Sequence, residues 1–208
     1  MWKIPSIILI ILGISLSARA QELVRQFYES GKVKSEGRLK EGLKVGEWRY
    51  FYPDGTPNSV ETYSKGVLDG KVIYYYPGGQ VQAIENWREG GLFDSAYYYH
   101  GNGEVDKKGI FENSSYTGTW HHYFRNGNTE RVVNYVNGLP EGETLVYNEQ
   151  GVLLQKGFYH EGKETGEWRF YGEDGSLEYV GSFRNGTPVG TWYSYRKGKQ
   201  KVYKKYKN

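Results

Sequence analysis

Hydrophobic and polar positions along this chain alternate in short runs that are bounded by glycine. Typical runs are VKSEGRLK at 33–40 and EWRYFY at 47–52, in which β-branched and aromatic residues are frequent. Period-two alternation between turn residues is typical of β-strands, and no run shows the spacing of an amphipathic helix. The pattern therefore predicts an all-β chain made of short strands and turns.

The same pattern returns at a fixed interval of 24 residues, as the near-identical EWRYFYPDG (47–55) and EWRFYGEDG (167–175) show. Glycine marks the interval in a column that includes Gly31, Gly55, Gly79, Gly103, Gly127, Gly151 and Gly175. Self-similarity at a period of this length indicates a tandem array of small structural units. Residues 21–208 are thus expected to form one repeat array of about seven units and a partial one.

Aromatic columns run in phase with the glycines and locate the strands. One column is filled in every unit: Phe27, Phe51, Tyr75, Tyr99, Tyr123, Tyr147, Tyr171 and Tyr195. A second column holds Trp48, Trp120, Trp168 and Trp192, with Val72, Ala96 and Thr144 in the same phase. We expect the filled column to stabilise the sheet, because aromatic pairs across strands do so.

Two strands and two turns in each unit predict a single-layer antiparallel β-meander, elongated and twisted. The turn at Pro53 to Gly55 is expected to be the tight one, and the turn from Glu41 to Gly46 the longer one. Neighbouring strands lie about 4.8 Å apart, so each unit advances the sheet by roughly 10 Å.

The N-terminus has the pattern of a secretory signal peptide. Lys3 precedes the apolar run from Ile4 to Leu16, and Ala18-Arg19-Ala20 fits a small-x-small cleavage site. We therefore expect residues 1–20 to be removed, the remaining chain to be periplasmic or secreted, and no membrane span to be left after cleavage. An uncleaved N-terminal anchor is the alternative.

Charge and composition exclude several classes of function. Of 27 basic and 24 acidic residues, Lys3 and Arg19 belong to the N-terminal segment, so the rest of the chain is close to neutral. Such a balance gives no electrostatic footprint for nucleic acid. The chain has no cysteine, so it has neither disulfides nor thiolate metal sites.

Catalytic chemistry has few candidates in the sequence. His121 and His122 are adjacent on a predicted strand and so point to opposite faces, while His100 and His122 occupy aromatic columns, where we expect them to stack. Glu47, Glu143 and Glu167 recur in phase, too far apart for a carboxylate pair. We expect no catalytic residue, no metal site and no cofactor, and hence no enzyme.

At the recurring motif G-x(3)-G-x-W-x(2)-[YF]-x(3)-G, the chain resembles the MORN repeat proteins. Specimens are GLKVGEWRYFYPDG, SSYTGTWHHYFRNG and GKETGEWRFYGEDG, and FYESGKVKSEGRLKEGLKVGEW is similar to the bacterial MORN repeat variant. The resemblance covers residues 27–206 and implies a single sheet of hairpins used as a scaffold or binding surface. Some relatives are labelled antitoxins of toxin–antitoxin systems.

Within the repeats, one strand position varies while the framework stays constant, which is typical of a partner surface. Its residues are Arg49, Ile73, Tyr97, His121, Leu145, Arg169 and Tyr193. We therefore expect an exported scaffold that binds another protein or cell-envelope material along an extended β-face. The alternatives are an antitoxin or immunity-type protein that neutralises a toxin, and a module that binds cell-wall glycan through exposed Tyr and Trp.

Overall fold

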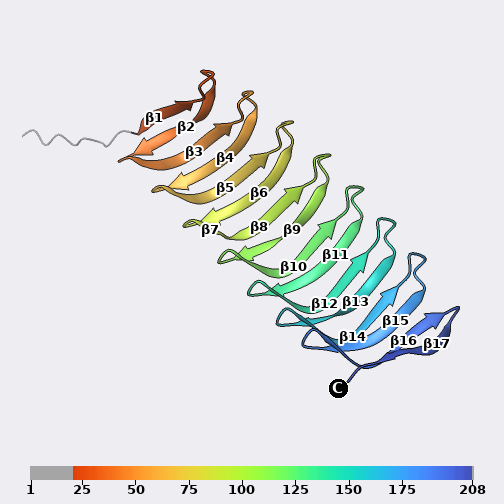
Figure 1. The fold of residues 1–208 in the computed structure, drawn as a ribbon. Coiled ribbons are helices and arrows are strands. Elements are labelled where there is room, and N and C mark those ends of the chain that lie inside the picture. The colour runs from red at the N-terminus through yellow and green to blue at the C-terminus, as the bar shows by residue number, and fades with distance from the viewer. Residues whose placement is uncertain (1–20, 208) are drawn as a thin grey trace, which may run out of the picture.

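A computed structural model describes residues 21–207, which form one open sheet of 17 strands (Figure 1). The signal peptide expected at residues 1–20 lies outside the described residues. Within residues 21–207 there is no helix at all, so none is long and apolar enough to cross a membrane. The all-β prediction is confirmed.

The strands follow one another in chain order. They are β1 (Glu22–Phe27), β2 (Val33–Lys40), β3 (Leu43–Phe51), β4 (Pro57–Ser64), β5 (Val67–Tyr75), β6 (Val81–Arg88), β7 (Gly91–Leu92), β8 (Asp94–Tyr99), β9 (Val105–Glu112), β10 (Ser115–Tyr123), β11 (Thr129–Val136), β12 (Leu139–Tyr147), β13 (Leu153–His160), β14 (Lys163–Tyr171), β15 (Leu177–Arg184), β16 (Thr187–Arg196) and β17 (Lys199–Lys205).

Strands pair antiparallel with their neighbours in the sequence, from β1–β2 at one edge to β16–β17 at the other, except that β7 and β8 both pair with β6. The hairpins therefore lie side by side in one elongated, curved and twisted layer (Figure 1). The register repeats as well: Trp48 pairs with Glu61 on β4, and Trp168 pairs with Gly181 at the same step on β15. This is the predicted single-layer β-meander.

The two kinds of turn differ from the prediction in length. Between β2 and β3 only Glu41 and Gly42 turn the chain, with φ of 55° and 77°. Positive φ at both central residues defines the tight type I′ hairpin. Gly46, expected to close a long turn, instead lies inside β3, where its φ of 65° accompanies a bulge in the pairing.

The other turn, at residues 52–56 between β3 and β4, is the longer one. The Gly55 N–H donates to the Tyr52 carbonyl at 2.9 Å, and the Tyr52 N–H donates to the Thr56 carbonyl at 2.8 Å. Gly55 has a φ of 94°. This is the geometry of a type I turn followed by a left-handed glycine, so the sequence assigned the two turn lengths the wrong way round.

One strand of the array is interrupted. Asp94 occupies the bulge position that glycine fills elsewhere and adopts a φ of 66°, and Phe93 separates β7 from β8. Both pieces still pair with β6, so the sheet is continuous across the break.

The core of this single layer lies on one face, which we call the Trp face. Trp48, Trp120, Trp168 and Trp192 are each at most 8% exposed, although residues 21–207 form only one layer. Their indoles lie across a glycine of the preceding strand, 11 residues earlier: a Cβ added at Gly109 would stand 2.3 Å from the Trp120 ring, and one at Gly157 2.1 Å from Trp168. Each indole N–H donates to the carbonyl of the residue after that glycine.

Units that lack this tryptophan also lack the glycine. The residues 11 positions before Val72, Ala96 and Thr144 are Glu61, Glu85 and Val133. A Cβ at the glycine position would collide with an indole packed against the strand, so a smaller residue follows. In these units the loss of tryptophan on one strand is therefore compensated by the loss of glycine on the neighbouring strand.

Candidate functional site

The seven residues expected to form a partner surface lie in one row across the sheet. They alternate with one residue from each intervening strand: Arg49 pairs with Val60, Val60 with Ile73, and Ile73 with Ile84. The full row reads Arg49, Val60, Ile73, Ile84, Tyr97, Lys108, His121, Val132, Leu145, Lys156, Arg169, Val180 and Tyr193. We call this the row surface. It faces away from the Trp face, because adjacent strand residues point to opposite sides.

Apolar and basic stretches alternate along the row surface. Four apolar side chains lie consecutively from Val60 to Tyr97, and Tyr97 is 38% exposed. Lys108 and His121 follow, and further on Lys156 lies beside Arg169. The six intervening strand residues were not among the sequence candidates. Counting 13 residues back from each column member after Arg49 would have found all six of them.

The recurring glutamates lie on the same side and pair with the basic members of the row. Glu47 accepts from Arg49 Nε at 2.8 Å, and Glu167 accepts from Arg169 Nε at 2.8 Å. The hydrogen bond that Arg169 donates to Glu167 raises the pKa of Arg169. Because both side chains of each pair are about half exposed, we expect these pairs to contribute little stability and to remain available for exchange with a partner.

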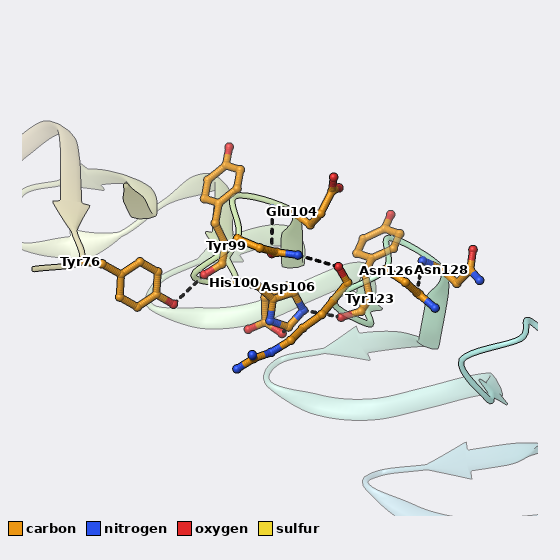
Figure 2. Close-up of polar contacts among 10 residues, drawn as sticks. Tyr76, Tyr99, His100, Glu104, Asp106, Tyr123, Asn126 and Asn128 are labelled. Carbon is orange, nitrogen blue, oxygen red and sulfur yellow. Dashed lines mark hydrogen bonds and ion pairs between the residues drawn. The ribbon is translucent and has the colours of Figure 1, made fainter. Parts of the chain in front are cut away.

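The filled aromatic column runs beside the row surface. The rings of His121 and Tyr123 stack with centroids 6.2 Å apart, and Lys108 Nζ lies 5.5 Å from the Tyr123 centroid. Figure 2 shows Tyr99 and Tyr123 pointing the same way from neighbouring hairpins. Their hydroxyls make no hydrogen bond to another residue within 21–207, whereas their carbonyls accept one from the preceding turn. At Tyr99 and Tyr123 the column therefore contributes its backbone carbonyls to the sheet and leaves the two hydroxyls without a partner in residues 21–207.

A ladder of side chains joins successive turns. The hydroxyls of Tyr28, Tyr52 and Tyr76 donate to carbonyls 23 residues later, at 2.6 to 2.8 Å. His100 takes the next place in this ladder (Figure 2), with Nε2 2.8 Å from the Tyr123 carbonyl oxygen. Nε2 must carry the proton there, because a carbonyl only accepts. The predicted aromatic slot is correct for His100, but its contact is a hydrogen bond and not ring stacking.

His122 and His121 lie on opposite faces, as predicted. His122 is half-buried on the Trp face, where burial, with further contributions from Arg131 and Lys107, lowers its pKa to about 4. Nowhere between residues 21 and 207 do three or more His, Asp or Glu side chains gather as metal ligands would. The histidines therefore form no common site.

Two carboxylates replace glycine on the Trp face, in β4 and β6. Glu61 accepts from the hydroxyls of Ser59 and Tyr63, and Glu85 from Tyr98 and the Trp87 indole. The two glutamates flank Val72, one strand on either side, and so are about 10 Å apart. Every carboxylate oxygen already has a donor, which indicates a structural network and not an acid–base pair.

A hollow on the Trp face was not predicted from the sequence. It encloses about 130 Å³ around Thr144 and is lined by Tyr135, Tyr159 and Trp168, with Arg131 and Gln155 at one end. Burial raises the pKa of Tyr159, and the Arg131 guanidinium acts in the opposite direction. The sequence signal was the missing tryptophan at Thr144.

The chain has only weak similarity to solved structures. The chain is similar to parts of the crystal structures of TcdB2-TccC3-Cdc42 and TcdB2-TccC3, at 15% identity and with 84% of this chain aligned in each. It spans only 13% of the length of either chain, and the TM-scores are 0.20 and 0.19, too low to support an argument. No curated protein matches the chain.

One family model matches the chain in five places. The model of the MORN repeat variant matches residues 23–41, 44–65, 68–89, 140–161 and 164–185, which together make up just over half of the chain. The unmatched interval contains the broken strand and the turn where serine replaces glycine. With the hairpin repeat seen in the structure, these matches show that the chain belongs to the MORN repeat variant family.

Proposed function

We propose that this protein is a non-enzymatic scaffold that acts outside the cytoplasm and binds another protein through its row surface. The observation that carries the proposal is the row itself, in which the varying positions of all seven units line up on an uncovered face. A repeat framework that stays constant while one aligned position varies is suited to hold an elongated partner.

The apolar stretch from Val60 to Tyr97 is the centre of the proposed interface. Val60, Ile73, Ile84 and Tyr97 are neighbours across successive strands. Tyr97 is exposed and the other three are partly exposed. Contiguous apolar surface with a polar rim is typical of binding sites, and an aromatic residue often carries much of the affinity. Arg49 and Lys108 border this stretch at its two ends.

Site-specific photocrosslinking in cells tests this function. A photoreactive phenylalanine placed at Ile73 or Tyr97 should capture a partner, whereas the same residue at Tyr74, on the opposite face of β5, should not. Equal capture from both faces, or none from any of the seven positions, would contradict the proposal. The double variant Ile73→Glu/Tyr97→Glu, which introduces two negative charges into the apolar stretch, should reduce capture at Leu145 if one partner spans the row.

The extracellular or periplasmic location rests on the N-terminal sequence pattern. Cell fractionation with an antibody against residues 21–207 should find the protein in the periplasm or medium, shortened by about twenty residues in a mass measurement. Full-length protein in the cytoplasm would refute the location and leave the binding surface to be tested separately.

Glycan binding is a second candidate, supported by the Tyr99 and Tyr123 hydroxyls that project from neighbouring hairpins without a partner in the described chain. Sugar rings stack on aromatic faces and their hydroxyls pair with phenols. Titration with peptidoglycan fragments, comparing the protein with its Tyr99→Ala/Tyr123→Ala variant, should show binding that the variant loses. Identical titrations of the two proteins would exclude this use of the column.

A further inference from the structure

The chain itself shows which ring fits beside Thr144. In the units that follow, an indole is held edge-on between two aromatic rings. Trp168 contacts Tyr159 at 5.4 Å and 88° and Phe183 at 5.8 Å and 71°. Trp192 is held in the same way, between Phe183 and Tyr206.

Thr144 is the equivalent position one unit earlier, where the rings are present but the indole is missing. Nine residues before Thr144 is Tyr135, and fifteen after it is Tyr159, the same offsets as those of the two rings around Trp168. Both tyrosines line the hollow, with Trp168 forming a third aromatic wall. The two rings that hold an indole around Trp168 are therefore present around Thr144, but the indole between them is missing.

The register places Thr144 at the centre of a three-strand patch. Val133 and Gly157 flank it directly on β11 and β13. Thr144 and Val133 are only 2% and 3% exposed, so the side chains around them cover both residues. A bound ring would therefore contact Tyr135, Tyr159 and Trp168. A Cβ on Val133, where other units have glycine, also keeps an incoming ring higher than the chain's own indoles.

One end of the patch is polar and without partners. Arg131 pairs with Val146 across β11–β12, and Val146 pairs with Gln155 across β12–β13, so the two polar residues face each other over one apolar residue. Neither side chain forms a hydrogen bond or ion pair with any other residue that the structure describes. A guanidinium and an amide in this arrangement match a carboxylate.

From this geometry we propose that the Thr144 hollow binds a small aromatic carboxylate. Its ring lies against Tyr135, Tyr159 and Trp168, and its carboxylate is held by Arg131 with Gln155. The occupant is a free small molecule and not the partner proposed above, because the hollow opens on the Trp face while the row surface lies on the other side. Its size suits one ring or two fused rings. The inference does not depend on the proposed function.

Fluorine NMR with 4-fluorophenylacetate tests the proposal on the purified chain from residue 21. For a ligand of this size we expect a dissociation constant on the order of 1 mM, seen as line broadening of the probe. The neutral probe 4-fluorobenzyl alcohol should bind at least about tenfold more weakly, because it has no charge to pair with Arg131. Equal broadening of the two probes, or none of either, would overturn the proposal.

Two variants locate the site. Val133→Gly with Thr144→Trp copies the glycine–tryptophan pair of the other units, fills the hollow with the chain's own indole, and should abolish binding. Arg131→Gln removes only the charge and should weaken binding of the carboxylate about tenfold while leaving the alcohol unchanged. Arg184→Gln, which removes an exposed positive charge on β15 outside the hollow, is the matched control and should bind as the original does. Unchanged binding by Arg131→Gln, or by a folded double variant, would refute the site.

Discussion

The pairing of glycine with tryptophan on the Trp face can be tested at Gly109 and Trp120. A methyl group at Gly109 would stand 2.3 Å from two carbons of the Trp120 ring, whose side chain is fully buried. The indole must then tilt away from the strand. Its edge contact with Phe111 at 5.1 Å and its hydrogen bond to the Ile110 carbonyl at 3.1 Å are both at risk.

The expected cost follows from these contacts. Overpacking a buried site costs about 1 to 3 kcal/mol, and a lost hydrogen bond adds about 1 kcal/mol. Gly109→Ala should therefore lower the free energy of unfolding by about 2 to 4 kcal/mol. Gly101→Ala is the matched control, because a Cβ at Gly101 meets no atom within 4 Å, and it should change stability by less than about 0.5 kcal/mol.

Urea unfolding followed by circular dichroism and tryptophan fluorescence measures both changes. A repeat array need not unfold in one step, so the midpoint of each transition is compared between variants. The sharper test is a double-mutant cycle with Gly109→Val and Trp120→Thr, which together copy Val133 and Thr144. The double variant should lose at least about 1 kcal/mol less than the sum of the single variants. Strict additivity, or equal stability of Gly109→Ala and Gly101→Ala, would refute the exchange between neighbouring strands.

Three further outcomes are expected. The pKa of His122 is lowered to about 4 in the folded chain, so the unfolded chain binds a proton first as the pH falls. The free energy of unfolding should therefore drop between about pH 6.5 and 4. His122→Tyr should reduce that drop, measured as the difference between urea midpoints at pH 7 and pH 5. Asp94→Gly should stabilise the chain by about 0.5 to 1 kcal/mol in thermal unfolding, because glycine accepts the φ of 66° without strain, and a lower melting temperature would contradict this. Replacing the lysines of the last strand and its end with threonine should promote self-association through the exposed edge of β17, and a strictly monomeric variant in size-exclusion chromatography would count against that role of charge. These lysines are Lys201, Lys204, Lys205 and Lys207.

The repeat made most of the fold predictable from the sequence. Glycine and aromatic columns located the strands, and strand alternation alone placed His121 and His122 on opposite faces. Turn lengths were wrong because glycine was treated as a turn residue everywhere. Gly46 has the same positive φ as a turn glycine but serves a bulge inside a strand, and the two uses look alike in sequence.

Contacts between units were harder to predict than the units themselves. The sequence contained the exchange of Gly157 and Trp168 for Val133 and Thr144, but its meaning depends on which residues oppose each other across strands, and a bulge shifts that register. The hollow could not be foreseen for the same reason. It exists only because walls from neighbouring units surround one small residue.

The strictly sequential pairing of the hairpins also bears on how such a chain can change over generations. Within residues 21–207 every strand pairs only with strands near it in the sequence, so duplication or loss of one hairpin unit leaves all other pairings in place. Each such event lengthens or shortens the molecule by about 10 Å and adds or removes one varying position. The length of the sheet can therefore change by whole repeat units while the packing of the remaining units stays the same.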